Sequence, residues 1–377
     1  MSQNLQWGSS IEISADSARR RRAFMGLGGL VIFTVAILML LGWPSRAQAV
    51  ERHGSVERIQ VHGRSLEGNL SGDSPDRYVS VYLPPSYNTS KARRYPVVYL
   101  LHGYNGTDAL WYSDPKHYIV VPNVADSAIN AGTARDMIIV TPDAHTLFAG
   151  SFYSNSVTTG DWEDFVARDL VGYIDSHYRT LRGAASRGLA GHSMGGYGAL
   201  RIAMKHPEIF SSLYLMSPGP LGGWLPGTPE EMAQVEAVKT LDDFRALNTS
   251  LRGRVAAAAA WAPNPNNPPL YLDLPVHDGQ LSPDVINKFV ANQPLAMIDQ
   301  YVTNLRKLQA IGFDAGAQDP VIAANLKLLD GILANYNIAH QFEIYEGTHT
   351  SRIAERFEIK ALPFFTKNLR FAAAVGQ

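Results

Sequence analysis

The stretch that most constrains how this chain can fold is Gly191-His192-Ser193-Met194-Gly195. A short apolar run, Gly188-Leu189-Ala190, precedes it, and a helix-like segment follows from Tyr197 to Lys205. A serine at a sharp turn between strand and helix has a strained backbone, and side chains two residues to either side would collide with neighbouring backbone. Glycine at both positions removes that collision. The pattern therefore predicts that Ser193 is a nucleophile in a strand–turn–helix elbow, although the bare five-residue pattern also recurs by chance in glycine-rich chains.

The segments around this elbow alternate between strand-like and helix-like patterns. Short runs rich in β-formers predict strands, and apolar residues at helical spacing predict helices. The expected strands are 57–62, 78–83, 96–101, 137–140, 188–190, 212–216, 311–316 and 341–345, and the main expected helices are 162–178, 197–205, 320–336 and 352–369. This alternation predicts a mainly parallel sheet covered on both faces, and together with the elbow it indicates the α/β-hydrolase fold.

The pattern changes between residues 217 and 310, where Pro- and Gly-rich pieces surround short helical stretches. We interpret this segment as a helical, cap-like insertion over the carboxyl edge of the sheet, within a single domain of residues 50–377. It would supply one wall of the substrate cleft. The alternative is a linker between two domains.

Composition excludes several classes of function. The chain has 377 residues, of which 46% are hydrophobic and 18% charged, with a net charge of −1 and no cysteine. The near-neutral charge gives no support to nucleic-acid binding. The absence of cysteine removes thiol nucleophiles and disulfides, and no His-Glu-x-x-His or comparable spacing is present, so we expect neither a metal nor a cofactor.

The first 49 residues have the pattern of an export signal. Arg19-Arg20-Arg21-Arg22 precedes an apolar run from Phe24 to Trp43, and Ala47-Gln48-Ala49 supplies small residues at cleavage spacing. Arg21-Arg22 with the residues after it resembles a twin-arginine signal. We therefore expect transient passage through a membrane and a periplasmic or secreted protein. An uncleaved signal would instead be a single-span membrane anchor, because roughly 20 apolar residues can cross a bilayer.

A base and an acid follow Ser193 in the order that this fold class uses. His349 lies in a short loop after the last expected strand, where its imidazole could take the serine proton. Asp319 lies in a turn after the preceding core strand and could orient that imidazole. Two alternatives stay open for the acid, because Asp319 could merely cap the helix that begins at Pro320, and Asp314 could be the acid.

An oxyanion hole needs two backbone N–H groups, one from the residue after the nucleophile and one from an early loop. Met194 would supply the first, and the loop His102-Gly103-Tyr104 the second, through the amide of Tyr104. We expect His102 itself to be a structural hydrogen-bonding residue. We expect His192, although adjacent to the serine, to point away from it.

Six motifs occur in one order that resembles the esterase D-type family of esterases. They are Leu101-His102-Gly103 with Gly106, Ser151-Phe152-Tyr153, Trp162-Glu163-Asp164-Phe165, Gly191 to Gly196, Gly316-Ala317-Gln318-Asp319 and Gly347-Thr348-His349. The family includes feruloyl and other carbohydrate esterases, S-formylglutathione hydrolases and mycolyltransferases. The resemblance implies a triad of Ser193, Asp319 and His349, oxyanion donors at Tyr104 and Met194, and Tyr153 and Trp162 in the lining of the cleft.

These observations predict an exported serine esterase that acts on small acyl, aryl or carbohydrate esters through an acyl-enzyme. An acyltransferase to a sugar or lipid hydroxyl shares the same acyl-enzyme and is the main alternative. A non-catalytic binding protein on this fold is a further one.

Overall fold

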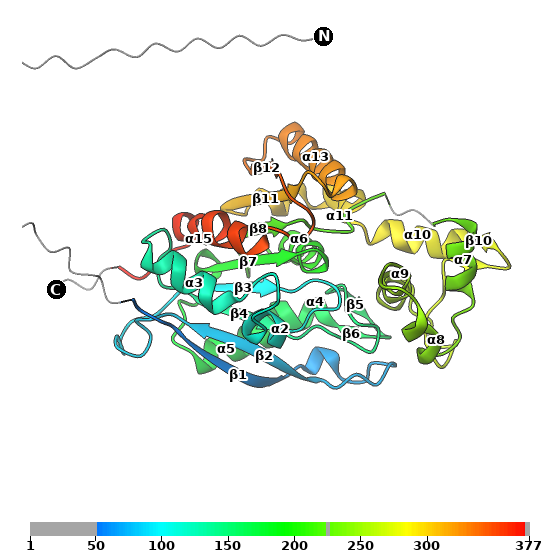
Figure 1. Ribbon diagram of the computed structural model, residues 1–377, viewed down its shortest axis with the longest axis horizontal. Coiled ribbons are helices and arrows are strands. Elements are labelled where there is room, and N and C mark those ends of the chain that lie inside the picture. Colours follow the sequence, from blue (N-terminus) through cyan, green and yellow to red (C-terminus); the bar gives the residue numbers. More distant parts are fainter. Residues whose placement is uncertain (1–50, 224–226, 374–377) are drawn as a thin grey trace, which may run out of the picture. The chain divides into compact units, whose positions relative to one another are not determined.

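The computed structural model describes residues 51–223 and 227–373 (Figure 1), and the expected export signal lies outside these residues. The described residues belong to one compact unit, which includes the insertion. None of the helices in this part of the chain combines the length and apolar character needed to span a bilayer.

A central sheet of eight strands organises the described residues. Its spatial order is β1 (Ser55–His62), β2 (Asp76–Leu83), β4 (Ile138–Pro142), β3 (Val97–Leu101), β7 (Arg187–His192), β8 (Ser212–Met216), β11 (Ala310–Gly316) and β12 (Gln341–Tyr345). The pairs β1–β2 and β2–β4 are antiparallel, and every pair from β4 to β12 is parallel. The prediction of a mainly parallel sheet is confirmed, and the antiparallel pairs are confined to its β1–β2–β4 edge.

Helices cover both faces of the sheet, as the fully buried central strands require. The covering helices are α2 (Asp108–Ser113), α3 (Val121–Asn130), α4 (Trp162–Asp164), α5 (Val171–His177), α6 (Met194–Lys205), α13 (Pro320–Asn335), α14 (Ile353–Arg356) and α15 (Leu362–Asn368). Alternate residues of β3 belong to different apolar cores: Val97 and Tyr99 share one with residues of α5, α6 and α13, whereas Val98 and Leu100 share the other with residues of α3 and α15.

Two helices expected to be continuous contain π-helical turns. Phe165–Leu170 separates α4 from α5, and Phe357–Ala361 separates α14 from α15. A π-helical turn accommodates one extra residue per turn without breaking the buried face, so the apolar spacing alone does not reveal it.

The insertion between β8 and β11 consists of short helices and one small hairpin. Its elements are α7 (Pro229–Glu236), α8 (Leu241–Ala246), α9 (Thr249–Trp261), β9 (Val276–His277), β10 (Gln280–Leu281), α10 (Pro283–Ala291), α11 (Pro294–Met297) and α12 (Val302–Leu305). In Figure 1 the helices α7 to α10 lie together beside the β5 (Asn155–Ser156) and β6 (Gly160–Asp161) hairpin. The prediction of a helical insertion in this fold is confirmed.

Candidate active site

Ser193 occupies the turn between β7 and α6 with a strained backbone. Its φ is 55° and its ψ is −120°, a region that non-glycine residues rarely adopt. A Cβ atom at Gly191 would lie 2.2 Å from the carbonyl oxygen of Gly195, and one at Gly195 would lie 2.0 Å from that of Leu101. Both positions therefore exclude any side chain, which is the steric condition that the sequence motif predicts.

The two expected oxyanion donors belong to segments that adjoin Ser193. A Cβ atom at Gly103 would lie 3.3 Å from the Cβ of Ser193, so the loop that carries Tyr104 lies against this serine. Met194 is the first residue of α6, where helix geometry leaves the amide unpaired. Among the described residues, no hydrogen bond from the amide of Tyr104 occurs. Both backbone amides are therefore available near Ser193.

His102 holds the loop of Tyr104 from within the core. Its Nε2 accepts a hydrogen bond from the amide of Ala144 at 2.9 Å, and its Nδ1 donates to the carbonyl of Gly103 at 2.8 Å. The hydroxyl of Tyr153 donates to the carbonyl of His102 at 3.1 Å. Because the ring is fully buried, the pKa of His102 is lowered, and the ring stays neutral with one donor and one acceptor. The structure thus gives His102 a structural role.

His349 and Asp319 meet beyond the ends of β11 and β12. The Nδ1 of His349 lies 2.5 Å from the Oδ2 of Asp319. Their loops are also joined through backbone, because the amide of Gln318 donates to the carbonyl of Gly347 at 3.0 Å. The carboxylate therefore holds the proton on Nδ1 and leaves Nε2 as the basic nitrogen.

Asp314, the alternative acid, is engaged elsewhere. It is fully buried within β11, where the hydroxyl of Tyr214 donates to its Oδ2 at 2.7 Å and the Nε of Arg356 donates to the same oxygen at 2.9 Å. Burial raises the pKa of Asp314, and the charge of Arg356 acts in the opposite direction. Asp314 belongs to a buried ion pair and has no contact with His349.

His192 connects strand β7, which precedes Ser193, to the loop of His349. Its Nε2 donates to the carbonyl of His349 at 2.9 Å, and its Nδ1 accepts from the hydroxyl of Tyr118 at 3.2 Å. Burial is the main cause that lowers the pKa of His192 to about 3, and the charge of His349 adds to it. The ring is therefore neutral near pH 7. Sequence reasoning found neither contact, because no local pattern indicates that His192 meets residues 157 and 74 positions away.

The structure does not pair every residue of the expected triad. A hydrogen bond between the hydroxyl of Ser193 and the ring of His349 is not formed among the described residues. The ring of His192, the residue before Ser193, has its centroid 4.7 Å from that of His349. Catalytic hydrogen bonds are often long in ligand-free enzymes and shorten when substrate binds.

The expectation that Tyr153 and Trp162 line the cleft is not met. Both side chains have no exposed surface. The ring nitrogen of Trp162 donates to the carbonyl of Thr159 at 2.8 Å, and Tyr153 bonds to the oxyanion loop. Both residues are buried in the core because removing their large apolar surface from water stabilises the fold.

Within residues 51–223 and 227–373, no three His, Asp or Glu side chains come together in a way that could hold a metal ion. The site described above consists of a strained serine, a histidine–carboxylate pair and two backbone amides.

Comparison with known proteins assigns the chain to a family. Residues 74–355 match the family model described as "Putative esterase", so the chain belongs to this esterase family. An esterase of Mycobacterium tuberculosis is 36% identical over 135 residues, which cover 36% of this chain and 27% of that protein. An endo-1,4-beta-xylanase/feruloyl esterase of Xylanibacter ruminicola is 28% identical over 191 residues, which cover 50% of this chain and 24% of that protein. The chain thus matches about a quarter of the length of these relatives.

A solved structure of a ferulic acid esterase has the same fold. Its TM-score is 0.59 at 22% identity, and the match covers 84% of this chain and all of that chain. The expected membership of an esterase family with the α/β-hydrolase fold is therefore confirmed.

Proposed function

We propose that this protein is an exported serine esterase that hydrolyses carboxylic esters through an acyl-enzyme. The observation that carries the proposal is the 2.5 Å contact between His349 and Asp319, beside a serine in a strained elbow. Family membership and the names of the relatives support ester hydrolysis. Export rests on the signal-like residues 1–49.

The proposed reaction begins when the Ser193 hydroxyl attacks the ester carbonyl. His349 takes the hydroxyl proton on Nε2, and Asp319 stabilises the imidazolium that forms. The amides of Tyr104 and Met194 donate to the oxygen that becomes negatively charged. His349 then protonates the leaving alcohol, and water, activated by the same imidazole, releases the acid from Ser193.

The proposed substrates are small-molecule or carbohydrate esters with small acyl or aryl groups. The relative named endo-1,4-beta-xylanase/feruloyl esterase supports esters whose acyl group comes from an aromatic acid. A panel of 4-nitrophenyl esters of increasing chain length, together with feruloylated and acetylated sugars, would identify the preferred acyl group.

A fluorophosphonate probe tests the nucleophile directly. We expect one adduct on Ser193, located by peptide mass spectrometry, and loss of 4-nitrophenyl acetate hydrolysis by at least about 10⁴-fold in Ser193→Ala. Ser186→Ala is a matched control, because Ser186 is a buried serine that precedes β7, outside the proposed site. Full activity in Ser193→Ala, or an adduct elsewhere, would overturn the assignment.

Product analysis separates hydrolysis from acyl transfer. The purified protein is incubated with an aryl ester and an acceptor sugar or lipid, and both free acid and acylated acceptor are measured. The proposal predicts free acid as the main product. An excess of acylated acceptor would instead identify an acyltransferase.

A further inference from the structure

A pocket of about 310 Å³ lies beside the loop that carries Tyr104. Asn105, the residue after Tyr104, forms part of its wall, so the pocket begins one residue from a proposed oxyanion donor. The opposite wall comes from the insertion, through Arg245 on α8 and Arg252 on α9. This volume accommodates a small substituent or a single ring.

Arg252 brings an uncompensated positive charge to this pocket. Among the described residues its buried Nε has no hydrogen-bond partner, and its Nη2 donates to the hydroxyl of Thr249 at 3.3 Å. In the part of the chain that the structure describes, no ion pair links Arg252 to a carboxylate. A guanidinium without a carboxylate partner favours a ligand with an anionic oxygen. Such an oxygen would neutralise the positive charge and accept a hydrogen bond from Nε.

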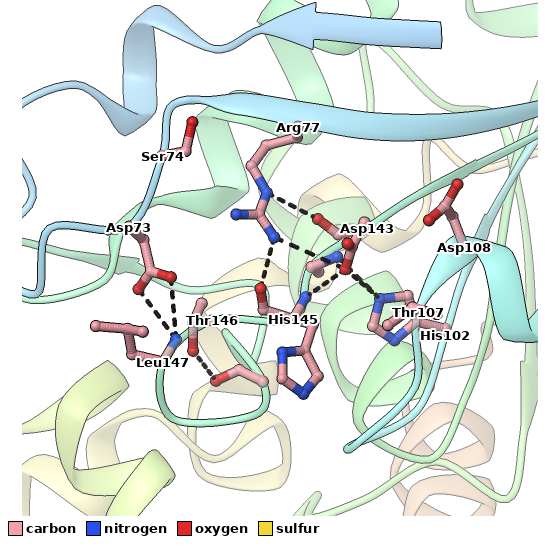
Figure 2. Close-up of polar contacts among 12 residues, drawn as sticks. Asp73, Ser74, Arg77, His102, Thr107, Asp108, Asp143, His145, Thr146 and Leu147 are labelled. Atoms are coloured by element: carbon pink, nitrogen blue, oxygen red, sulfur yellow. Dashed lines mark hydrogen bonds and ion pairs between the residues drawn. The ribbon is translucent and has the colours of Figure 1, made fainter. Parts of the chain in front are cut away.

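Two neutral donors face the same pocket. Asn105 has a φ of 60°, and its backbone amide donates to the carbonyl of Ala149 at 3.0 Å, while its side chain has no partner among the described residues. The ring of His145 likewise has no hydrogen-bond partner there, and Figure 2 shows it pointing away from Arg77 and Asp143. Burial lowers the pKa of His145 and outweighs the charge of Asp143, which raises it, while the charges of Arg77 and Arg252 lower it further. The ring therefore donates one hydrogen bond without carrying a charge.

The one carboxylate in the lining, Asp73, is already engaged. Its oxygens accept from the amide of Leu147, at 3.0 and 3.2 Å, and from the hydroxyl of Ser71, at 2.8 Å. Figure 2 shows this carboxylate turned toward the amide of Leu147. Its negative charge is thus partly balanced by local donors, and it does not pair with Arg252.

We propose that this pocket binds a carboxylate group of the ester substrate, with Arg252 as its main partner and Asn105 and His145 as additional donors. The inference rests on the proposed function and narrows the range of its substrates. The pocket would make the enzyme selective for esters that carry a second, anionic group. Consecutive Cα atoms are about 3.8 Å apart, so the Asn105 wall of the pocket lies next to the residue whose amide would bind the ester carbonyl.

Matched ester pairs test this selectivity. 4-Acetoxybenzoate and its methyl ester place the charge on the alcohol side, and the 4-nitrophenyl esters of succinate and of methyl succinate place it on the acyl side. In at least one pair we expect kcat/KM to be about tenfold higher for the anionic member, mainly through KM. Arg252→Gln should abolish this preference. Equal or inverted preference in both pairs, or a preference that survives Arg252→Gln, would overturn the proposal.

Arg254→Gln is the matched control, because it removes the same charge from the same helix. Arg254 pairs with Glu231 at 3.3 Å and does not line the pocket. We expect it to keep the wild-type preference. Thermal melts of both variants, monitored by circular dichroism, verify that they are folded.

Calorimetric titration separates failure of the pocket from failure of the esterase. 4-Hydroxybenzoate and succinate should bind the wild-type protein about tenfold more tightly than Arg252→Gln and equally well to Arg254→Gln. Binding that depends on Arg252, without turnover of any ester, would overturn the esterase and support the pocket. Turnover of neutral esters, without such binding or preference, would support the esterase and overturn the pocket.

Discussion

At the scale of single residues, the site depends on backbone conformations that only certain neighbours permit. A non-glycine residue at a φ of 55° costs about 1–3 kcal/mol, so the packing around Ser193 must impose it. Gly191 and Gly195 allow the strand, the turn and the helix to come into backbone contact at this point. Ser193, the proposed nucleophile, is therefore held in place by residues that have no reactive side chain.

Gly191→Ala should destabilise the protein by more than about 2 kcal/mol and reduce esterase activity at least 100-fold. The new Cβ would lie 2.2 Å from a backbone oxygen that cannot move without opening the elbow. Gly172→Ala is the control, because an added Cβ there meets nothing within 4 Å in helix α5, and it should stabilise by about 0.5–1 kcal/mol. Urea unfolding and ester hydrolysis measure both effects, and a harmless Gly191→Ala would contradict the steric argument.

Replacing each of the two aspartates with asparagine separates the proposed catalytic acid from the structural one. Asp319→Asn should reduce kcat/KM by about 10³–10⁴-fold and leave stability nearly unchanged, because it alters the histidine tautomer in a partly exposed site. Asp314→Asn should cost about 3 kcal/mol of stability, because Arg356 would lose a charged partner inside the core. The reverse pattern would assign the catalytic role to Asp314.

His192 makes the folded state sensitive to acid. Its pKa is about 3 in the folded protein and about 6.5 in the unfolded chain, so below pH 6.5 the unfolded chain binds the proton more tightly. This difference in pKa contributes roughly 3–5 kcal/mol to the free energy of unfolding. The contribution is fully present above pH 6.5 and is lost as the pH falls to about 3.

His192→Gln tests this dependence, because glutamine can still donate to the carbonyl of His349 but does not titrate. Urea unfolding between pH 7 and pH 4 should show a shallower loss of stability in the variant than in the wild type. The free energy of unfolding would still depend on pH in both proteins, in part because of His102, whose pKa is also lowered. Equal slopes in the two proteins would contradict the assignment to His192.

At the scale of elements, helix α9 attaches the insertion to the catalytic core. Trp261 at its end packs against Phe152 and Tyr197, with ring centroids 5.1 and 5.4 Å apart, and its ring nitrogen donates to the hydroxyl of Ser154 at 3.2 Å. The hydroxyl of Tyr197, on α6, donates to the carbonyl of Asn292 at 2.9 Å. These contacts join the insertion to the helix that follows the nucleophile.

Trp261→Ala should therefore destabilise the protein by about 3–5 kcal/mol, because removal of the buried indole leaves a cavity. Activity should fall as well, because this cavity would lie beside α6. Trp261→Phe keeps most of the packing and should cost about 1 kcal/mol. Val290→Ala, on the exposed face of α10, should change stability by less than about 0.5 kcal/mol. Full activity in a strongly destabilised Trp261→Ala protein would show that the insertion does not support the site.

At the scale of the whole molecule, the proposed export route and the fold are compatible. Twin-arginine export carries folded proteins, and a chain without cysteine needs no oxidising compartment to fold. Changing Arg21 and Arg22 together to lysine should retain the protein in the cytoplasm, as fractionation and immunoblotting would show. Changing Arg19 and Arg20 instead is the control and should leave export intact. Export of the first variant would contradict a twin-arginine route.

Much of the fold was predictable because its signals are local. Local patterns, such as apolar runs, helical spacing and the glycines around Ser193, depend only on neighbouring residues. They predicted the strands, the insertion and the strand-end positions of Asp319 and His349. The π-helical turn at 165–170 was not predictable, because it preserves the apolar spacing on both sides.

The sequence by itself determined the chain order of serine, aspartate and histidine, the parallel sheet and the family. Only the tertiary structure decided that Asp319, and not Asp314, contacts His349, that Tyr153 and Trp162 are buried, and that His192 bridges to the loop of His349. These outcomes depend on which residues from distant strands meet and how deeply they are buried. Packing between elements sets both, and no local pattern in the sequence encodes them.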